Sequence, residues 1–245
     1  MENTITIDTS FDFRSDTPPS KDPDTWSPSL SRHHQFLWTK PLPCGAVFHL
    51  EYQNPPYYLN HNSDLGDFSL SSDTVVPTFL RLNNIGDLAT EKQVSDFRSI
   101  SYTIGGMMMF PANQIERKWT INQARGCIRK ISDRFDLTVE CIRRHYTGGE
   151  SPLGEVLARY ADFFRLFEDF QGYVEFFLLH DLVSSDRTAV NFFLPFDNFN
   201  SSAVPQDRSE YHDYRTNAIE FIVARNQRMD DWASNHLANR IPATD

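Results

Sequence analysis

The sequence predicts an α+β fold, and the main observation behind this prediction is a change of hydrophobic period along the 245-residue chain. Up to about residue 125, short runs of β-branched and aromatic residues alternate with turns rich in Pro, Asn, Asp and Gly. From residue 126 onward, apolar residues recur every three or four positions, as in amphipathic helices. A late run, AVNFFLPF at 189–196, again has the composition of a strand. We therefore expect one domain over residues 1–245, in which a mixed or antiparallel sheet from the first half, with a strand near residue 190, packs against a helical second half.

An opening strand and a helix are expected before residue 41. Alternating apolar residues at positions 5 to 13 predict the strand, and four prolines within residues 18–28 predict an extended segment after it. Ser27 followed by Pro28 is typical of a helix start, because serine caps the first free amides and proline fits the first turn. This helix must end before Pro41.

Further strands and a short helix are expected between residues 46 and 122. The strand-like runs are AVFHLEY, YYLNHN, DFSLSSDTVV, SYTIGGMMMF and KWTIN, and Asn-Pro-Pro and Asp-Leu-Gly turns separate the first three. Thr90 is placed to cap a helix that runs to about Ser99. The Gly105-Gly106 pair inside a strand indicates a bulge, or a backbone that a ligand or another chain approaches closely.

Helices are expected through most of the second half. One begins at Ile128 and ends at Gly148, a second begins at Ser151, and a last one covers about 210–237. The run at 173–183 fits either a buried helix or a strand. We expect the Phe-rich residues 153–196 to form the centre of the helical core, since each aromatic side chain buries a large apolar area.

Composition and charge exclude several classes of protein. The net charge of −10 disfavours binding to nucleic acid, for which only residues 125–144, with five Arg and one Lys, would form a basic patch. No run of apolar residues is long enough to span a membrane, and the first ten residues lack the pattern of a secretory signal. Three unpaired cysteines indicate a reducing compartment, so a cytoplasmic protein is expected.

The sequence lacks the motifs of metal and cofactor sites. None of the eight histidines is paired at the spacing that places two rings on one helix face, and there is no Cys-x-x-Cys. Dinucleotide-binding, phosphate-loop and serine-nucleophile motifs are also missing. We expect no metal and no cofactor, and folding that depends on neither metal nor disulfide.

Polar residues gather at the ends of two predicted strands. His61 closes one strand, and Ser71, Ser72 and Asp73 close the next. At one sheet edge, an imidazole, hydroxyls and a carboxylate would serve binding and proton transfer. In the alternative interpretation, these residues only close turns and cap the next segment.

A predicted strand-to-helix turn supplies the candidate anion site. Asn122 and Arg125 lie in it and Arg129 follows, so amide donors and guanidinium groups would face a phosphate or carboxylate near a helix start. The alternative is a surface turn in which Gly126 supplies an unusual backbone angle. On the next helix, Glu140 is a candidate acid or base, or else a member of a solvated ion-pair ladder.

Several strings along the chain resemble those of a bacterial family catalogued only as a domain of unknown function. They include FDFRSDTPP, LSSDTVVPTF, YTIGGMM, INQARG and DRFDLTVECIRRHY, spread over residues 6–229, with Gln123 and Val139 as mild departures. The resemblance implies a bacterial cytoplasmic protein and transfers no catalytic residue. Separately, the run from Phe68 to Ser72 resembles the aromatic and Ser-Thr-Ser strand of ADP-ribosyltransferases, although their accompanying Arg or His and Glu are not clearly placed here.

Two functions remain open at the level of sequence. The first is an enzyme acting on a nucleotide or another phosphate-bearing small molecule, with an ADP-ribosyltransferase-like variant. Its catalytic residues would be His61, Asp73 and Glu140, and its binding residues Ser71, Ser72, Asn122, Arg125 and Arg129. The second is a non-catalytic protein-interaction partner, for example in a phage-defence or toxin–antitoxin locus, for which the Phe-rich residues 163–196 would supply an exposed apolar face.

Overall fold

A small antiparallel sheet lies at the centre of the computed structural model, which describes residues 7–52, 58–77 and 88–238. Its strand order is β3 (Glu51–Tyr52), β4 (Leu59–Ser63), β5 (Gly66–Thr74) and β6 (Met107–Pro111). The expected Asp-Leu-Gly turn joins β4 to β5 as a hairpin in which Ser63 pairs with Gly66 and Leu59 with Leu70. The short strands β1 (Lys40–Pro41) and β2 (Val47–Phe48) form a separate pair. The expected Asn-Pro-Pro turn lies outside the described residues.

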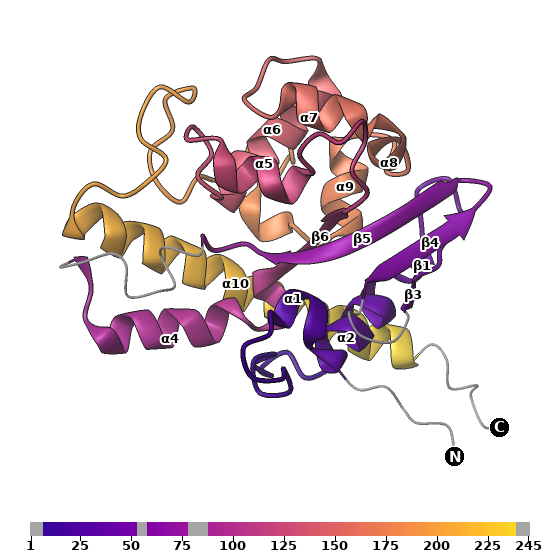
Figure 1. Cartoon of the computed structure of the whole chain (residues 1–245), viewed down its shortest axis with the longest axis horizontal. Helices are drawn as coiled ribbons and strands as arrows, with labels where there is room; N and C mark the ends of the chain where they lie inside the picture. Colours follow the sequence, from indigo (N-terminus) through magenta and orange to yellow (C-terminus); the bar gives the residue numbers. More distant parts are fainter. Residues whose placement is uncertain (1–6, 53–57, 78–87, 239–245) are drawn as a thin grey trace.

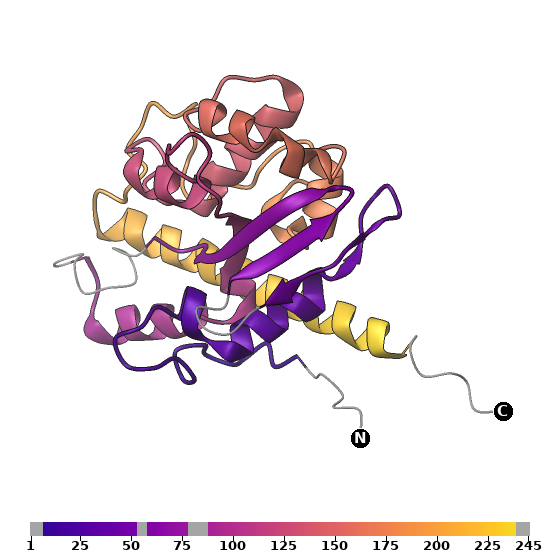
Figure 2. The same ribbon diagram turned by 45° about the vertical axis from the view of Figure 1, so that its right-hand side comes forward.

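Helices pack on both sides of this sheet (Figures 1 and 2). The helical elements are α1 (Pro23–Trp26), α2 (Pro28–Trp38), α4 (Glu91–Ser101), α5 (Ile121–Cys127), α6 (Phe135–Thr147), α7 (Gly154–Arg159), α8 (Ala161–Arg165), α9 (Phe170–Phe176) and α10 (Arg208–Ala238), with 3-10 turns η2 (Ile104–Gly106) and η3 (His180–Leu182). In both views α5 to α9 lie above the sheet, whereas α1, α2, α4 and the long α10 lie below it. The α+β prediction is confirmed.

Local signals in the sequence correctly mark several helix ends. The Ser27 side chain accepts a hydrogen bond from the Leu30 amide at the start of α2. Thr90 forms a capping box at the start of α4. Gly148 ends α6 in the left-handed conformation (φ 73°) that glycine adopts without strain. These ends depend on contacts within a few residues, which is why the sequence predicts them.

Several predicted strands are wrong. Residues 7–13 form turns, and position 5 lies outside the described residues. The KWTIN run does not pair with β6, because Thr120 starts α5 with a capping box in which Gln123 takes the third helical position. The run at 189–196 contributes only one isolated bridge, Val183 to Val190.

Two helical segments also differ from expectation. Four residues of the proline-rich segment form α1, since Asp22 caps it and Pro23 fits its first turn. The helix expected from Ser151 is divided into α7 and α8 at Tyr160. The ambiguous run at 173–183 is the end of α9 followed by η3.

The Gly105-Gly106 pair lies in η2, where the sequence predicted a strand. A Cβ atom on Gly105 would lie 2.5 Å from the carbonyl oxygen of Ile222 and 2.7 Å from Asn226 Oδ1, both on α10. The Gly105 amide also donates to Asn226 Oδ1 at 2.7 Å. The close approach that the glycines permit is therefore made by α10 of the same chain.

The Phe-rich residues 153–196 lie in the core, as predicted. Phe164 and Phe167 are buried, and the ring of Phe167 packs against four neighbouring aromatic rings. Within the described ranges, no helix is long and apolar enough to cross a membrane.

Candidate functional site

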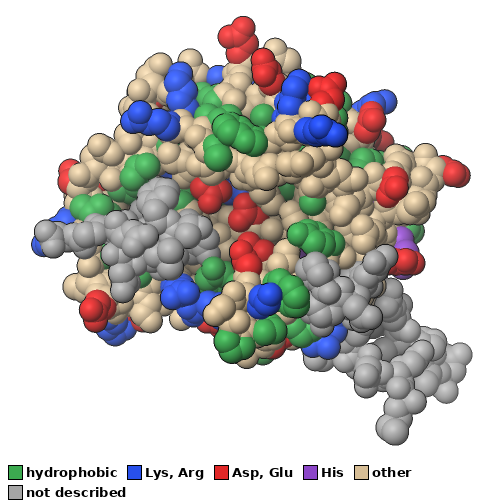
Figure 3. Space-filling model, in the orientation of Figure 1, with side chains coloured by type: hydrophobic (Ala, Val, Ile, Leu, Met, Phe, Trp, Pro, Cys, Tyr) green, Lys and Arg blue, Asp and Glu red, His purple; other side chains and the backbone are tan. Residues whose placement is uncertain are grey.

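A polar hollow of about 730 Å³ opens between α1, β5 and α5, within the size range of small-molecule sites. Carboxylate, hydroxyl and amide side chains line most of it: Asp22, Asp24, Thr25, Tyr58, Ser69, Ser71, Ser72, Asp73, Asn113, Gln114, Thr120, Asn122 and Gln123, with Ala112. Acidic side chains gather near the centre of the face shown in Figure 3. Four of the eight predicted site residues are in this lining: Ser71, Ser72, Asp73 and Asn122.

Asn122 joins α5 to the sheet at the hollow. Its side-chain amide donates to Ser71 Oγ at 3.1 Å. Its Oδ1 atom is buried and has no hydrogen-bond partner among the described residues. A buried acceptor of this kind costs free energy unless a donor reaches it, so Asn122 is the lining residue best suited to accept a hydrogen bond from a ligand.

Asp73 is held by Arg125, at the rear of the hollow. Arg125 Nη1 lies 2.7 Å from Asp73 Oδ2, and Nη2 lies 3.2 Å from Asp133 Oδ1. Arg125 Nε also donates to Thr138 Oγ1 at 3.0 Å. Because the Arg125 side chain is fully buried and surrounded by these acceptors, it is a structural ion-pair partner of the carboxylates.

The predicted strand-to-helix turn is also wrong. Residues Asn122 to Gly126 lie inside α5, and Gly126 has no positive φ. Arg129 is exposed on the turn that follows α5 and does not line the hollow. The two arginines predicted to bind an anion are therefore not assembled at one site.

Ser72 belongs to a buried chain of hydrogen bonds. The indole N–H of Trp38 donates to His34 Nδ1 at 2.9 Å, which fixes the proton of the neutral ring on Nε2. His34 Nε2 then donates to Ser72 Oγ at 2.9 Å. Burial lowers the pKa of His34 to about 3, so the ring is neutral at physiological pH. This chain connects α2 to β5.

His61 is remote from the chemistry predicted for it. It does not line the hollow, and its ring packs against Phe48 with centroids 4.4 Å apart. His61 Nδ1 lies 2.8 Å from the carbonyl oxygen of His49, and Nε2 lies 2.7 Å from Ser63 Oγ. The imidazole is buried with both nitrogens engaged, so the pairing with Asp73 proposed from the strand ends is not formed.

Glu140 is occupied by two arginines of its own helix. Its carboxylate oxygens lie 2.7 Å from Arg143 Nε and 2.7 Å from Arg144 Nε. Burial acts to raise the pKa of Glu140, but the hydrogen bonds from both arginines outweigh burial and lower the pKa. An acid ionised in this way does not donate a proton near neutral pH.

The arginines of residues 125–144 do not form the basic patch that the sequence suggested. Arg125 and Arg134 are buried, and Arg134 pairs with Asp136. Arg143 and Arg144 share the carboxylate of Glu140, so Arg129 and Lys130 are the exposed basic residues that remain of this segment.

Comparison with known proteins places the chain in one family. Residues 7–229 match the model of a family of unknown function, DUF6994. The chain belongs to this family. No curated protein and no solved structure matches it significantly. Because the function of DUF6994 is unknown, membership assigns no residue roles to this chain.

Two acidic residues of the hollow in this DUF6994 member, Asp22 and Asp24, were not predicted from the sequence. Both come from the proline-rich segment, where Asp22 accepts a hydrogen bond from the Asp24 amide and caps α1. The Asp-Pro pair at 22–23 has the same cap-then-proline pattern as Ser27-Pro28, and this signal could have placed a helix here.

Metal ligands are not grouped in the part of the chain that the structure describes. No three or more His, Cys, Asp or Glu side chains there are arranged to hold a metal ion.

Proposed function

We propose that this protein binds a small cationic molecule, such as an amine or polyamine, in the acidic hollow between α1, β5 and α5. The observation that carries the proposal is the composition of the lining. It includes the carboxylates of Asp22, Asp24 and Asp73, and none of the described residues that line it is Lys, Arg or His. Opposite charge attracts a cation to such a site, and the overall charge of −10 adds to the attraction.

The lining also provides hydrogen-bond acceptors for an amine. Asn122 Oδ1 is a buried acceptor without a protein donor, and the hydroxyl groups of Ser71 and Thr25 can accept as well. Arg125 compensates the charge of Asp73. The carboxylates of Asp22 and Asp24 add to the acidic character of the lining. An ammonium group carries the donors and the charge that this lining complements.

A phosphate-bearing ligand is the second candidate, and it is weaker. It depended on Arg125 and Arg129, of which the first is buried in ion pairs and the second lies outside the hollow. Phosphate oxygens would meet carboxylates of like charge. Repulsion from the carboxylates also disfavours an ADP-ribosyltransferase-like activity, because its substrate carries a diphosphate.

Binding is better supported than catalysis. The three residues proposed to move protons, His61, Asp73 and Glu140, each have separate partners in the fold. The protein-interaction alternative needed an exposed apolar face from the Phe-rich segment, yet Phe163, Phe167 and their neighbours there are largely buried.

Thermal unfolding with two sets of ligands tests this proposal. We expect spermidine and related amines to raise the melting temperature of the parent protein in a concentration-dependent manner. Asn122→Leu should abolish this increase, because it replaces the acceptor with an apolar group of similar size, whereas the matched control Arg129→Ala should retain it. Stabilisation by nucleoside phosphates that is lost in Arg129→Ala would instead favour the phosphate ligand and contradict the proposal.

A further inference from the structure

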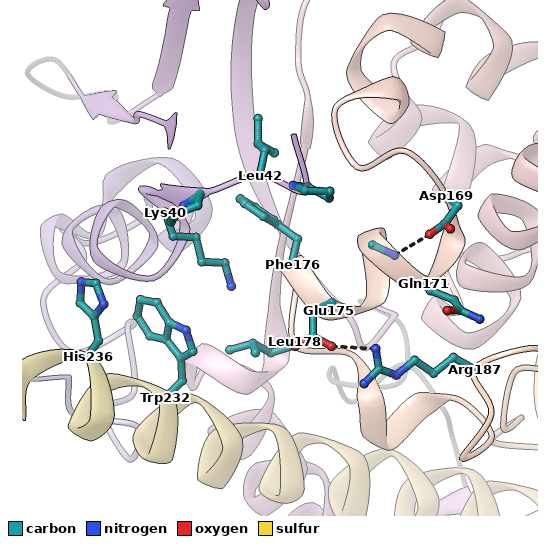
Figure 4. A pocket seen from close by; sticks show the side chains of 13 residues that line it. Lys40, Leu42, Asp169, Gln171, Glu175, Phe176, Leu178, Arg187, Trp232 and His236 are labelled. Atoms are coloured by element: carbon teal, nitrogen blue, oxygen red, sulfur yellow. Dashed lines mark hydrogen bonds and ion pairs between the residues drawn. The ribbon is translucent and has the colours of Figure 1, made fainter. Parts of the chain in front are cut away.

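A second cavity contains an unusual lysine. The cavity has a volume of about 590 Å³ and lies between β1, α9 and α10. Lys40 of β1 contributes to its lining although only 7% of the residue is exposed. Figure 4 shows the side chain extending from β1 toward Trp232 of α10.

Aromatic rings surround the Lys40 amine. Nζ lies 5.0 Å from the ring centroid of Trp38, 4.8 Å from that of Phe176 and 5.1 Å from that of Trp232. It makes no hydrogen bond or ion pair with any described residue. Lysine is rarely buried without a carboxylate partner, and here contacts with the three ring faces take the place of that partner.

The charged groups near Lys40 do not neutralise it. Glu175 of α9 is already paired with Arg187, at 2.7 Å, and with His180, at 3.0 Å. Arg225 of α10 is a buried cation that acts on Lys40. The lining also includes Asp169 and His236, and the His236 ring stacks on Trp232 with centroids 4.8 Å apart. Burial lowers the pKa of Lys40 to about 7; Glu175 opposes this effect and Arg225 adds to it.

We propose that Lys40 is a nucleophilic amine that forms an imine with a small aldehyde or ketone entering this cavity. A desolvated lysine beside another cation is the environment that activates an amine toward carbonyl groups. The apolar part of the lining, which includes Leu42, Phe176 and Trp232, selects a carbonyl compound with an apolar body.

The chemical step is balanced without an oxidant or a metal. The neutral Lys40 amine adds to the carbonyl carbon and forms a C–N bond. The carbonyl oxygen then leaves as water, taking both protons of the amine, and a C=N bond remains. Water releases the bound compound by the reverse step: it hydrolyses the C=N bond and regenerates the carbonyl compound and the Lys40 amine.

Reductive trapping on the full chain tests this assignment. The protein is treated at pH 7 with benzaldehyde or formaldehyde and cyanoborohydride, and each modified lysine is quantified by peptide mass spectrometry. A lysine with a pKa near 7 is half neutral at this pH, whereas an ordinary lysine is neutral in roughly one molecule in 2,500. We expect Lys40 to react about tenfold faster or more than the exposed Lys92 and Lys118 with either aldehyde.

A variant of the cavity wall provides the control. Trp232→Ala admits water to the amine, so the rate at Lys40 should fall toward that of Lys92, while the exposed Trp119→Ala should leave the rate unchanged. A Lys40 rate equal to or below that of Lys92 in the parent protein would overturn the proposal. Preferential labelling by formaldehyde without benzaldehyde would likewise refute the cavity as a carbonyl site.

Discussion

Three buried arginines form hydrogen bonds and ion pairs that connect distant parts of this chain. The guanidinium groups of Arg125, Arg134 and Arg225 are buried and end on carboxylates or backbone carbonyls. Arg225, for example, donates to the carbonyl oxygen of Met107 at 2.8 Å and to that of Gly105 at 3.0 Å. Planar guanidinium groups can bridge several acceptors at once, so these residues connect elements that are far apart in sequence.

Replacing Arg125 therefore tests a structural role. We expect Arg125→Ala to lower the free energy of unfolding by about 3–5 kcal/mol, because it leaves Asp73 and Asp133 without their buried cation. Denaturant unfolding measures this loss, and the exposed Arg129→Ala should change stability by less than about 0.5 kcal/mol. Equal stability of the two variants would contradict the ion-pair role.

At the scale of elements, contacts between η2 and α10 replace the predicted strand at residues 101–106. Asn226 accepts from the Gly105 amide and donates to Thr103 Oγ1 at 2.8 Å, so one side chain holds the 3-10 turn. Gly106 is equally restricted, because a Cβ atom there would lie 2.3 Å from the carbonyl oxygen of Ser101. β6 begins only after this turn, at Met107.

The two glycines 105 and 126 give a matched comparison. Gly105→Ala should destabilise the protein by about 1–3 kcal/mol, because the new methyl group overlaps α10. Gly126→Ala should be neutral or stabilise by up to about 1 kcal/mol, since Gly126 lies in α5 and has open space around its Cα. Denaturant midpoints measure both effects. A Gly105→Ala variant as stable as the parent would show that η2 does not approach α10 this closely.

At the scale of the whole molecule, stability should depend on pH through His34. Its pKa of about 3 in the folded state lies below the value near 6.5 of the unfolded chain, so the unfolded state binds the additional proton between these values. Stability should be greatest above pH 6.5 and fall by about 1.4 kcal/mol per pH unit for this one site as the pH decreases toward 3.

Unfolding measured from pH 5 to 6.5 avoids most carboxylates, which titrate below that window. Burial also lowers the pKa of His33 and of His145, so a variant of His34 is needed to separate its contribution. His34→Gln should reduce the slope of stability against pH, while replacing the exposed His212 with Gln should not. If the slope is the same with and without the His34 ring, the Trp38–His34–Ser72 chain does not control acid stability.

The extent of the hydrophobic core is relevant to the number of domains in the chain. Buried apolar residues from Phe13 to Met229 form one core cluster that includes both the sheet and the helices. One domain over residues 1–245 remains our prediction, and it agrees with a core to which both halves contribute.

The sequence by itself determined the α+β class, the caps at Ser27 and Thr90, the end of α6 at Gly148, and the buried Phe-rich segment. Each depends on neighbouring residues or on composition, so a local pattern is sufficient. Only the tertiary structure decided that Arg125 is buried against Asp73, that His61 lies outside the hollow, and that Lys40 is enclosed by aromatic rings. Those outcomes depend on contacts between residues far apart in the chain, and burial decides whether a polar side chain is available to a ligand or is already bonded within the fold.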